Sequence, residues 1–223
     1  MELSALPALD AVVISHDHYD HLDMDSIIAL TRSQNAVFVV PLGVGAHLRS
    51  WGVSPARVIE LDWDQSHQLG KLTLTCTQAR HFSGRSLSRN TTLWASWSIA
   101  GPKHKVFFGG DTGYTKAFKV IGDTYGPFDL TLLPVGAYNT SWADIHMNPE
   151  EAVQTHLDLA TSQAPLLPIH WATFNLALHP WAEPIERLLT AAGEQGVTVV
   201  APKPGQRADM RQPVAPDGWW RLS

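Results

Sequence analysis

Three histidines and three aspartates lie within nine residues near the start of the chain, in the sequence SHDHYDHLD at positions 15–23. They follow directly after the apolar run AVVI, which predicts a buried strand. A turn at the end of a strand can bring His16, His18, Asp20 and His21 toward one point, and imidazole and carboxylate groups are transition-metal ligands. A lone HxH pair is better explained by a polar turn that caps a helix. The complete HxHxDH pattern after an apolar run favours a metal site.

Three further residues of ligand type follow predicted strands in the same way. His81 follows the run TLTCT, Asp111 lies in the glycine-rich turn GGDTGY, and His170 follows APLLPI. Loops at one edge of a sheet assemble the sites of α/β folds, so we expect these residues to converge. A two-metal hydrolytic site also needs a bridging carboxylate. The segment GGDTGY lacks the lysine of a phosphate-binding loop. We therefore interpret its glycines as residues that permit a sharp turn around Asp111.

Composition limits the function classes. The chain has 223 residues, 44% of them hydrophobic, and a formal net charge of -5 without a block of like charge. This predicts a globular protein that does not bind nucleic acid. We expect it to be cytoplasmic, because no apolar run is long enough to span a bilayer and no export signal begins the sequence. Its one cysteine, Cys76, can form neither an internal disulfide nor a multi-cysteine metal site. Any metal ligands are therefore expected to be histidine and carboxylate side chains.

Short β-branched runs alternate with helical patterns, which predicts a single α/β domain over residues 1–223 with an irregular tail at 201–223. Strands are expected at 11–15, 37–40, 57–61, 71–79, 92–100, 105–109, 129–135, 165–169 and 197–200. Helices are expected at 24–33, 43–51, 114–122, 149–160 and 182–193. Asp23 is the expected N-cap of the first helix; Asn148, followed by Pro149, is that of the fourth.

The HxHxDH motif, followed by a lone histidine, a glycine-flanked aspartate and a last histidine, resembles the metallo-β-lactamase superfamily. Within it, HFSGR, GGDTGY, HMNPEEAV and PIHWATFNLALHPWAEP resemble the branch that contains N-acylphosphatidylethanolamine-hydrolysing phospholipase D and its bacterial relatives. The resemblance runs from about residue 9 to about residue 195. It implies two zinc ions, with iron or manganese as alternatives that suit the same ligands. The implied ligands are His16, His18 and His81 for one ion, and Asp20, His21 and His170 for the other, with Asp111 bridging both.

The resemblance also implies an αββα sandwich. Members of the family carry several strands before the HxHxDH strand, whereas this chain begins about ten residues before its first predicted strand. We therefore expect a sandwich that lacks its N-terminal strands and leaves an open sheet edge, which favours association.

The implied function is that of a binuclear-metal-dependent hydrolase, a phosphodiesterase that attacks a phospholipid-like substrate through a hydroxide held between the ions. A lactone, ester or amide hydrolase with the same site and a non-catalytic short form are the alternatives. The expected partner is a small-molecule or lipid-like substrate, with peripheral membrane contact; the sequence does not specify an oligomeric state. Asp20 and His146, which precedes a helix N-cap, are both candidates to protonate the leaving group.

The other histidines and the tryptophans are assigned less specific roles. His47, His67, His104 and His156 lie in helix-like or turn segments and are expected to be surface or structural residues. For His179, which precedes a proline, a turn role and a role near the site are equally open. The tryptophans of LWASWSI are expected to fill the core. An alternative role, as walls of a pocket for an acyl chain, stays open for Trp142, Trp171 and Trp181.

Overall fold

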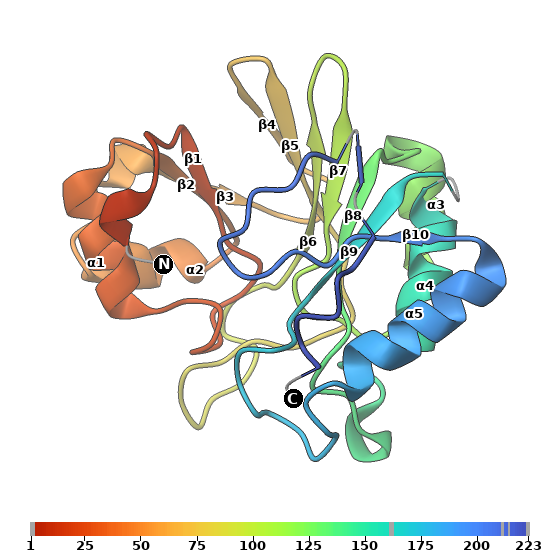
Figure 1. The fold of residues 1–223 in the computed structure, drawn as a ribbon. Helices are drawn as coiled ribbons and strands as arrows, with labels where there is room; N and C mark the ends of the chain where they lie inside the picture. The colour runs from red at the N-terminus through yellow and green to blue at the C-terminus, as the bar shows by residue number, and fades with distance from the viewer. Residues whose placement is uncertain (1–2, 161–162, 211, 214, 222–223) are drawn as a thin grey trace.

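The computed structural model describes residues 3–160, 163–210, 212–213 and 215–221, and its strands form two sheets (Figure 1). The smaller sheet is parallel and contains, in spatial order, β1 (Ala11–Val13), β2 (Val37–Pro41) and β3 (Val58–Leu61). The larger sheet contains, in spatial order, β10 (Thr198–Val199), β9 (Pro165–Ile169), β8 (Leu130–Pro134), β7 (Lys105–Phe108), β6 (Ser96–Ala100), β5 (Leu72–Thr77) and β4 (Ser66–Leu69). Strands β10 to β7 are parallel, and β7 to β4 are antiparallel.

Helices cover the outer face of each sheet (Figure 1). Those on the smaller sheet are α1 (Met24–Ser33) and α2 (Val44–Ser50); those on the larger sheet are α3 (Ala117–Tyr125), α4 (Pro149–Leu159) and α5 (Glu183–Gln195). Short 3-10 helices are η1 (Leu3–Ala5), η2 (Pro55–Arg57) and η3 (Thr140–Trp142). The layer order is therefore helix, sheet, sheet, helix, and the predicted αββα architecture is confirmed.

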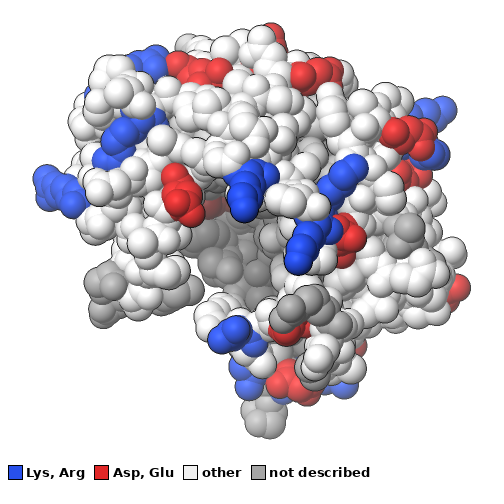
Figure 2. All heavy atoms as spheres, turned by 90° about the horizontal axis from the view of Figure 1, so that it is seen from above, with Lys and Arg blue, Asp and Glu red and all other residues white. Residues whose placement is uncertain are grey.

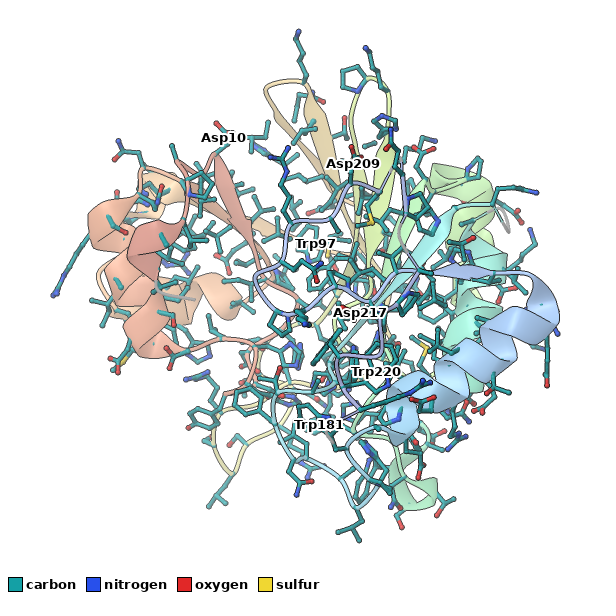
Figure 3. The ribbon with its side chains drawn as sticks, viewed as in Figure 1. Asp10, Trp97, Trp181, Asp209, Asp217 and Trp220 are labelled. Carbon is teal, nitrogen blue, oxygen red and sulfur yellow. The ribbon has the colours of Figure 1, made fainter. Side chains whose placement is uncertain are left out.

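Alternation of apolar side chains along the strands fills the three interfaces between layers. In β2, Phe38 packs against the helices and Val39 packs between the sheets. In β7, Phe107 packs against the helices of the larger sheet and Phe108 packs between the sheets. Trp97 of β6 is fully buried at the centre of the sandwich (Figure 3), as predicted for LWASWSI. Its indole nitrogen donates to the Ile14 carbonyl at 3.0 Å, which ties the two sheets together just before the HxHxDH loop.

Both predicted helix N-caps are confirmed. The Asp23 side chain accepts a hydrogen bond from the Ser26 amide at 2.8 Å. Asn148 and Glu151 form a capping box, in which each side chain accepts from the backbone amide of the other residue. The helix that follows the HxHxDH loop and the helix that follows His146 therefore start at fixed points.

Two predicted elements are displaced. The strand expected at 92–100 begins only at Ser96, because the amides of Leu93 and Ala95 donate instead to the carbonyls of Leu42 and Ser15. The helix expected at 114–122 lies at Ala117–Tyr125. Gly122 is inside that helix instead of ending it, and its lack of a side chain lets α3 pack closely on α4, because a Cβ there would lie 2.1 Å from the Asp158 carbonyl oxygen.

Strand β4 was not predicted, because its sequence SHQL is polar and it lies at the edge of the larger sheet. Strand β1 lies at one edge of the smaller sheet. The described residues after Val200 form turns and loops. The single domain and the missing N-terminal strands stay predictions.

Charge is dispersed over the face shown in Figure 2, where Lys and Arg alternate with Asp and Glu. The absence of a nucleic-acid ligand stays a prediction. Among the helices of the described residues, none has both the length and the apolar character needed to cross a membrane.

Candidate metal centre

The seven predicted ligands converge at one end of the sandwich, where four loops meet. The loop between β1 and α1 carries His16, His18, Asp20 and His21; the other three loops, after β5, β7 and β9, carry His81, Asp111 and His170 respectively. His16 and Asp111 are almost fully buried, with 1% and 3% of their surface exposed. Buried polar groups of this kind require polar or metal partners. In this cluster the ligand-type side chains lie against one another.

Three imidazole nitrogens form the first set. His16 Nε2 lies 2.9 Å from His18 Nδ1, which lies 3.3 Å from His81 Nε2. Ligand atoms around a tetrahedral zinc ion, each about 2.0–2.1 Å from the metal, are separated from one another by about 3.3 Å. The spacing of the first set therefore fits one transition-metal ion.

Two carboxylates and two imidazoles form the second set. Asp111 Oδ2 lies 3.0 Å from His21 Nε2 and 3.3 Å from His170 Nε2. Asp20 Oδ2 lies 3.3 Å from each of the same two nitrogens. This set has the mixed nitrogen and oxygen donors and the spacing of a second ion site.

Asp111 stands between the two sets. Its Oδ2 is also 4.0 Å from His16 Nε2 and 3.9 Å from His81 Nε2. Among the described residues, the buried Asp111 Oδ1 and His21 Nε2 have no hydrogen-bond partner of acceptable geometry. Orphaned buried atoms that face lone-pair donors are what a cation would satisfy, so the residues present fit two metal ions with Asp111 shared.

Metal binding requires neutral imidazoles and ionised carboxylates, and the pKa values of His16, His81 and Asp111 suit it. Burial lowers the pKa of His16 well below its usual value and that of His81 to about 3. Burial alone would raise the pKa of Asp111, but the neighbouring His21 and His170 side chains lower it strongly. Burial likewise opposes charge on His21, yet the neighbouring carboxylates of Asp111 and Asp20 raise its pKa to about 9. The second set therefore stabilises positive charge.

Hydrogen bonds at the far side of two rings fix which nitrogen faces the cluster. His81 Nδ1 donates to the Ile145 carbonyl at 3.0 Å, because a carbonyl oxygen can only accept. His16 Nδ1 lies 3.0 Å from Ser15 Oγ, which can accept in the same way. Each ring then presents Nε2 with its lone pair toward the ion site, an arrangement typical of metal-ligating histidine.

Asp17, between the first two histidines, anchors the HxHxDH loop and is fully buried. Its carboxylate accepts from the Gly84 amide at 2.7 Å, from Thr92 Oγ1 at 3.0 Å and from His47 Nε2 at 3.3 Å. The loop that follows His81 is thereby held against the loop that carries His16 and His18. Asp17 was not among the predicted site residues, although its place between two predicted ligands was an available signal.

Arg85 holds the same loop at two further points. Its guanidinium Nη1 donates to the carbonyls of Asp17 and Leu22, which lie on either side of the ligands His18, Asp20 and His21. The guanidinium carbon also lies 4.2 Å from the centre of the Tyr19 ring and 5.1 Å from that of Trp51. Sequence reasoning missed this residue, although it is the last letter of the quoted HFSGR segment.

We expect Arg85→Lys to weaken zinc binding at both sites by about tenfold, because lysine lacks the planar fork that bonds and stacks here. Zinc titration of the metal-free protein measures this effect. Arg32→Lys, on the exposed end of α1, is the matched control. Unchanged zinc affinity in Arg85→Lys would exclude a positioning role for the guanidinium.

Close backbone packing brings the remaining ligand loops together. Gly110 has φ +59°, and a Cβ there would lie 2.5 Å from Ser15 Cβ, so the predicted sharp turn before Asp111 is confirmed. A Cβ on Gly136 would lie 2.2 Å from the His170 carbonyl oxygen. His170 itself has φ +58°, a left-handed conformation that costs a non-glycine residue about 1–3 kcal/mol.

His146 lies beside both sets. Its ring stacks on that of His170 with centroids 5.4 Å apart and meets the edge of His81 at 5.2 Å. Burial lowers the pKa of His146 to about 4. Its buried Nδ1 has no partner among the described residues. The ring therefore lies against one ligand of each set, His81 and His170.

The other histidines lie outside the two sets. His179 Nε2 accepts from the Ala137 amide at 2.9 Å, and its ring stacks on Tyr138. His156 is fully buried and shares a hydrogen bond with Thr131 Oγ1, whereas His104 is exposed beside Asp129. His67 lies in β4 and is partly exposed. His47 contacts the anchoring residue Asp17 but no ligand.

An open cleft leads to the first set, and an apolar hollow adjoins the second. Besides the ligands, the cleft is lined by residues that include Phe82, Arg89 and Trp142. The hollow is lined by Phe108, Ile169, Trp171, Phe174 and Leu176. Trp142 therefore lines the cleft and Trp171 lines the hollow, and a role as the wall of an acyl-chain pocket stays a prediction. Trp181 is 46% exposed and donates to the Trp220 carbonyl.

Comparisons with known proteins identify the family of the chain. A family model described as "Beta-lactamase superfamily domain" matches residues 2–171. An uncharacterised protein of Mycobacterium tuberculosis is 65% identical over the whole chain, which covers 60% of that protein. N-acyl-phosphatidylethanolamine-hydrolyzing phospholipase D 1 of Caenorhabditis elegans is 37% identical over 84% of this chain and 56% of its own length. The chain thus spans little more than half the length of these relatives.

A solved structure has the same fold. The isothiocyanate hydrolase from Delia radicum gut bacteria superposes with a TM-score of 0.73 at 22% identity, over 94% of this chain and 80% of that one. Family model, relatives and fold all agree with the two-sheet sandwich. The chain is accordingly a member of the metallo-β-lactamase superfamily.

Proposed function

We propose that this chain is a binuclear-metal-dependent hydrolase, and specifically a phosphodiesterase that acts on a phospholipid-like substrate. The observation that carries the proposal is the arrangement of two ligand sets around the shared carboxylate of Asp111. When bound, two such ions activate water for attack at neutral pH and neutralise charge on the phosphoryl oxygens. Zinc is the proposed metal, because nitrogen and oxygen donors at tetrahedral spacing are ligands that zinc accepts.

The residues around the ligands have separate tasks in this proposal. Arg89 is the basic side chain in the lining of the cleft and attracts the anionic phosphodiester. His146 faces the leaving group and gives it a proton. It is favoured over Asp20, since bonds to His170 and His21 outweigh burial and lower the Asp20 pKa, so that this carboxylate holds no proton. An anionic phosphate beside the buried His146 ring favours its protonated form.

An apolar arm of the substrate has a place beside the second set. The hollow that contains His21 and His170 is otherwise lined mainly by apolar side chains, among them Phe108 and Ile169. On its rim, Phe174 is 62% exposed and Leu176 is 48% exposed. Exposed apolar side chains next to a polar site are typical of surfaces that contact apolar ligands or lipid. The likeness to N-acylphosphatidylethanolamine-hydrolysing relatives supports the same substrate class.

The test is hydrolysis by the zinc-loaded chain of a bis(aryl) phosphodiester, an N-acylated phospholipid and a panel of neutral lactones. We expect both phosphodiesters to be hydrolysed. Hydrolysis of lactones alone, with both ions bound, would exclude the phosphodiesterase proposal and favour carbonyl chemistry at the same site.

The Arg89→Gln variant sharpens this test. We expect KM for a phosphodiester to rise by about tenfold, because an anion loses a cation in the cleft, and KM for any neutral ester to stay unchanged. The rise should shrink at high salt, which screens exposed charges. Arg32→Gln is the control for a general loss of positive charge. An equal change for anionic and neutral substrates would contradict a phosphate-binding role for Arg89.

A further inference from the structure

The last described residues of the chain pack against the neighbour of a proposed ligand. Trp171, which directly follows His170, has its ring centroid 5.3 Å from that of Trp219 and 5.8 Å from that of Trp220. Trp220 is 1% exposed and belongs to the core between the larger sheet and its helices. Trp171 and Trp219 are partly buried against the same core. The tail therefore forms an aromatic cluster directly beside the metal site.

Polar contacts fix the tail in this position. The Trp220 indole nitrogen donates to Glu186 Oε1 of α5 at 2.7 Å. The guanidinium of Arg221 binds both carboxylate oxygens of Glu186, at 2.7 and 2.9 Å. The Trp219 indole nitrogen donates to the Ala201 carbonyl at 2.9 Å. Bidentate and indole hydrogen bonds of this kind specify one orientation of the segment, and not merely its burial.

The backbone on both sides of Trp171 is strained. His170 has φ +58° and Ala172 has φ +57°, both in the left-handed region that residues with a Cβ rarely adopt. Such conformations persist only where the surrounding structure determines them. Trp171 is the side chain between the two strained residues. Its indole nitrogen donates to the Pro168 carbonyl, and among the described residues its contacts with other aromatic rings are to Trp219 and Trp220 of the tail.

We propose that residues 217–221 are a positioning element of the metal centre: Trp219 and Trp220 hold Trp171, and through it the strained backbone that presents His170 to Asp111. This rests on the proposed function, in which His170 ligates the second ion. The tail does not touch the reacting atoms. Its effect is restricted to the second set, because the first set is carried by the loops after β1 and β5.

The experiment is a zinc titration of the metal-free full chain, wild type against Trp219→Ala. We expect the dissociation constant of one ion to rise by about tenfold, as for other residues that orient a ligand, and that of the other ion to stay within twofold. Trp63→Ala is the matched control, since Trp63 is also partly buried and also donates its indole hydrogen to a carbonyl, at 2.8 Å. Trp219→Leu is titrated as well, because leucine retains apolar volume against the core. If Trp219→Ala does not fold, the leucine variant still tests the inference.

A double-mutant cycle assigns the affected ion. In a His170→Ala background, Trp219→Ala should cause no further loss of zinc affinity, whereas in a His81→Ala background its tenfold effect should persist. Equal zinc binding by wild type, Trp219→Ala and Trp219→Leu would overturn the inference while leaving the proposed function intact. Wild-type protein that binds fewer than two zinc ions would instead overturn the proposed function itself.

Discussion

Replacement of Asp111 by asparagine is expected to remove both metal ions and to lower turnover by more than about 100-fold. Asparagine has nearly the same shape as aspartate, so the buried site keeps its packing. The amide, however, brings no negative charge to either ligand set, and Oδ2 of this residue lies within 4.0 Å of nitrogens in both. Elemental analysis of the purified variant measures the ion content directly.

Two comparisons make the Asp111 result specific. His81→Ala should weaken mainly the first ion and His170→Ala mainly the second, so each should leave about one ion per chain. Asp129→Asn, which changes an exposed carboxylate away from the cluster, should keep both ions. Normal metal content and normal turnover in Asp111→Asn would show that this carboxylate is not the bridge.

His146→Ala is expected to retain both ions and to lose turnover by about 10²–10⁴-fold with an alkyl leaving group, the usual size of a general-acid contribution. An alkoxide needs a proton as it departs, whereas a nitrophenolate leaves without one. The loss should therefore be much smaller with an aryl phosphodiester. Comparison of kcat on the two substrates provides the measurement.

His179→Ala is the matched control for His146, because His179 also lies near the cleft but bonds only to backbone groups. A loss of the same size on both leaving groups would assign His146 to positioning, through its stack on His170, instead of proton transfer. Loss of an ion in the His146 variant would show that the ring is itself a ligand, since His146 also lies close to His81 and Asp111.

Local sequence patterns carry much of the architecture and the candidate ligands. One short motif after a strand contains four of the candidate ligands: His16, His18, Asp20 and His21. The glycines beside Asp111 indicate the sharp turn that the backbone makes there. The caps at Asp23 and Asn148 are equally local, since each side chain bonds to an amide three residues further on. These features depend on neighbours in the sequence, which a pattern can reveal.

The contacts that hold the ligand loops in place could not be predicted from local sequence patterns, because they join distant parts of the chain. Asp17 binds Gly84 and Thr92, 67 and 75 residues away. Trp171 contacts Trp219 although α5 and β10 lie between them in the sequence, and no periodicity indicates such a contact. The displacement of helix α3 has the same origin, because the close approach of Gly122 to Asp158 exists only in the folded structure.

The most direct test of the central claim is the location of the metal ions in crystals of the zinc-loaded chain, measured by anomalous scattering at the zinc edge. The expected result is two peaks that share Asp111: one within ligand distance of His16 Nε2, His18 Nδ1 and His81 Nε2, the other within ligand distance of Asp20, His21 and His170. A single peak, or two peaks away from Asp111, would contradict the binuclear site.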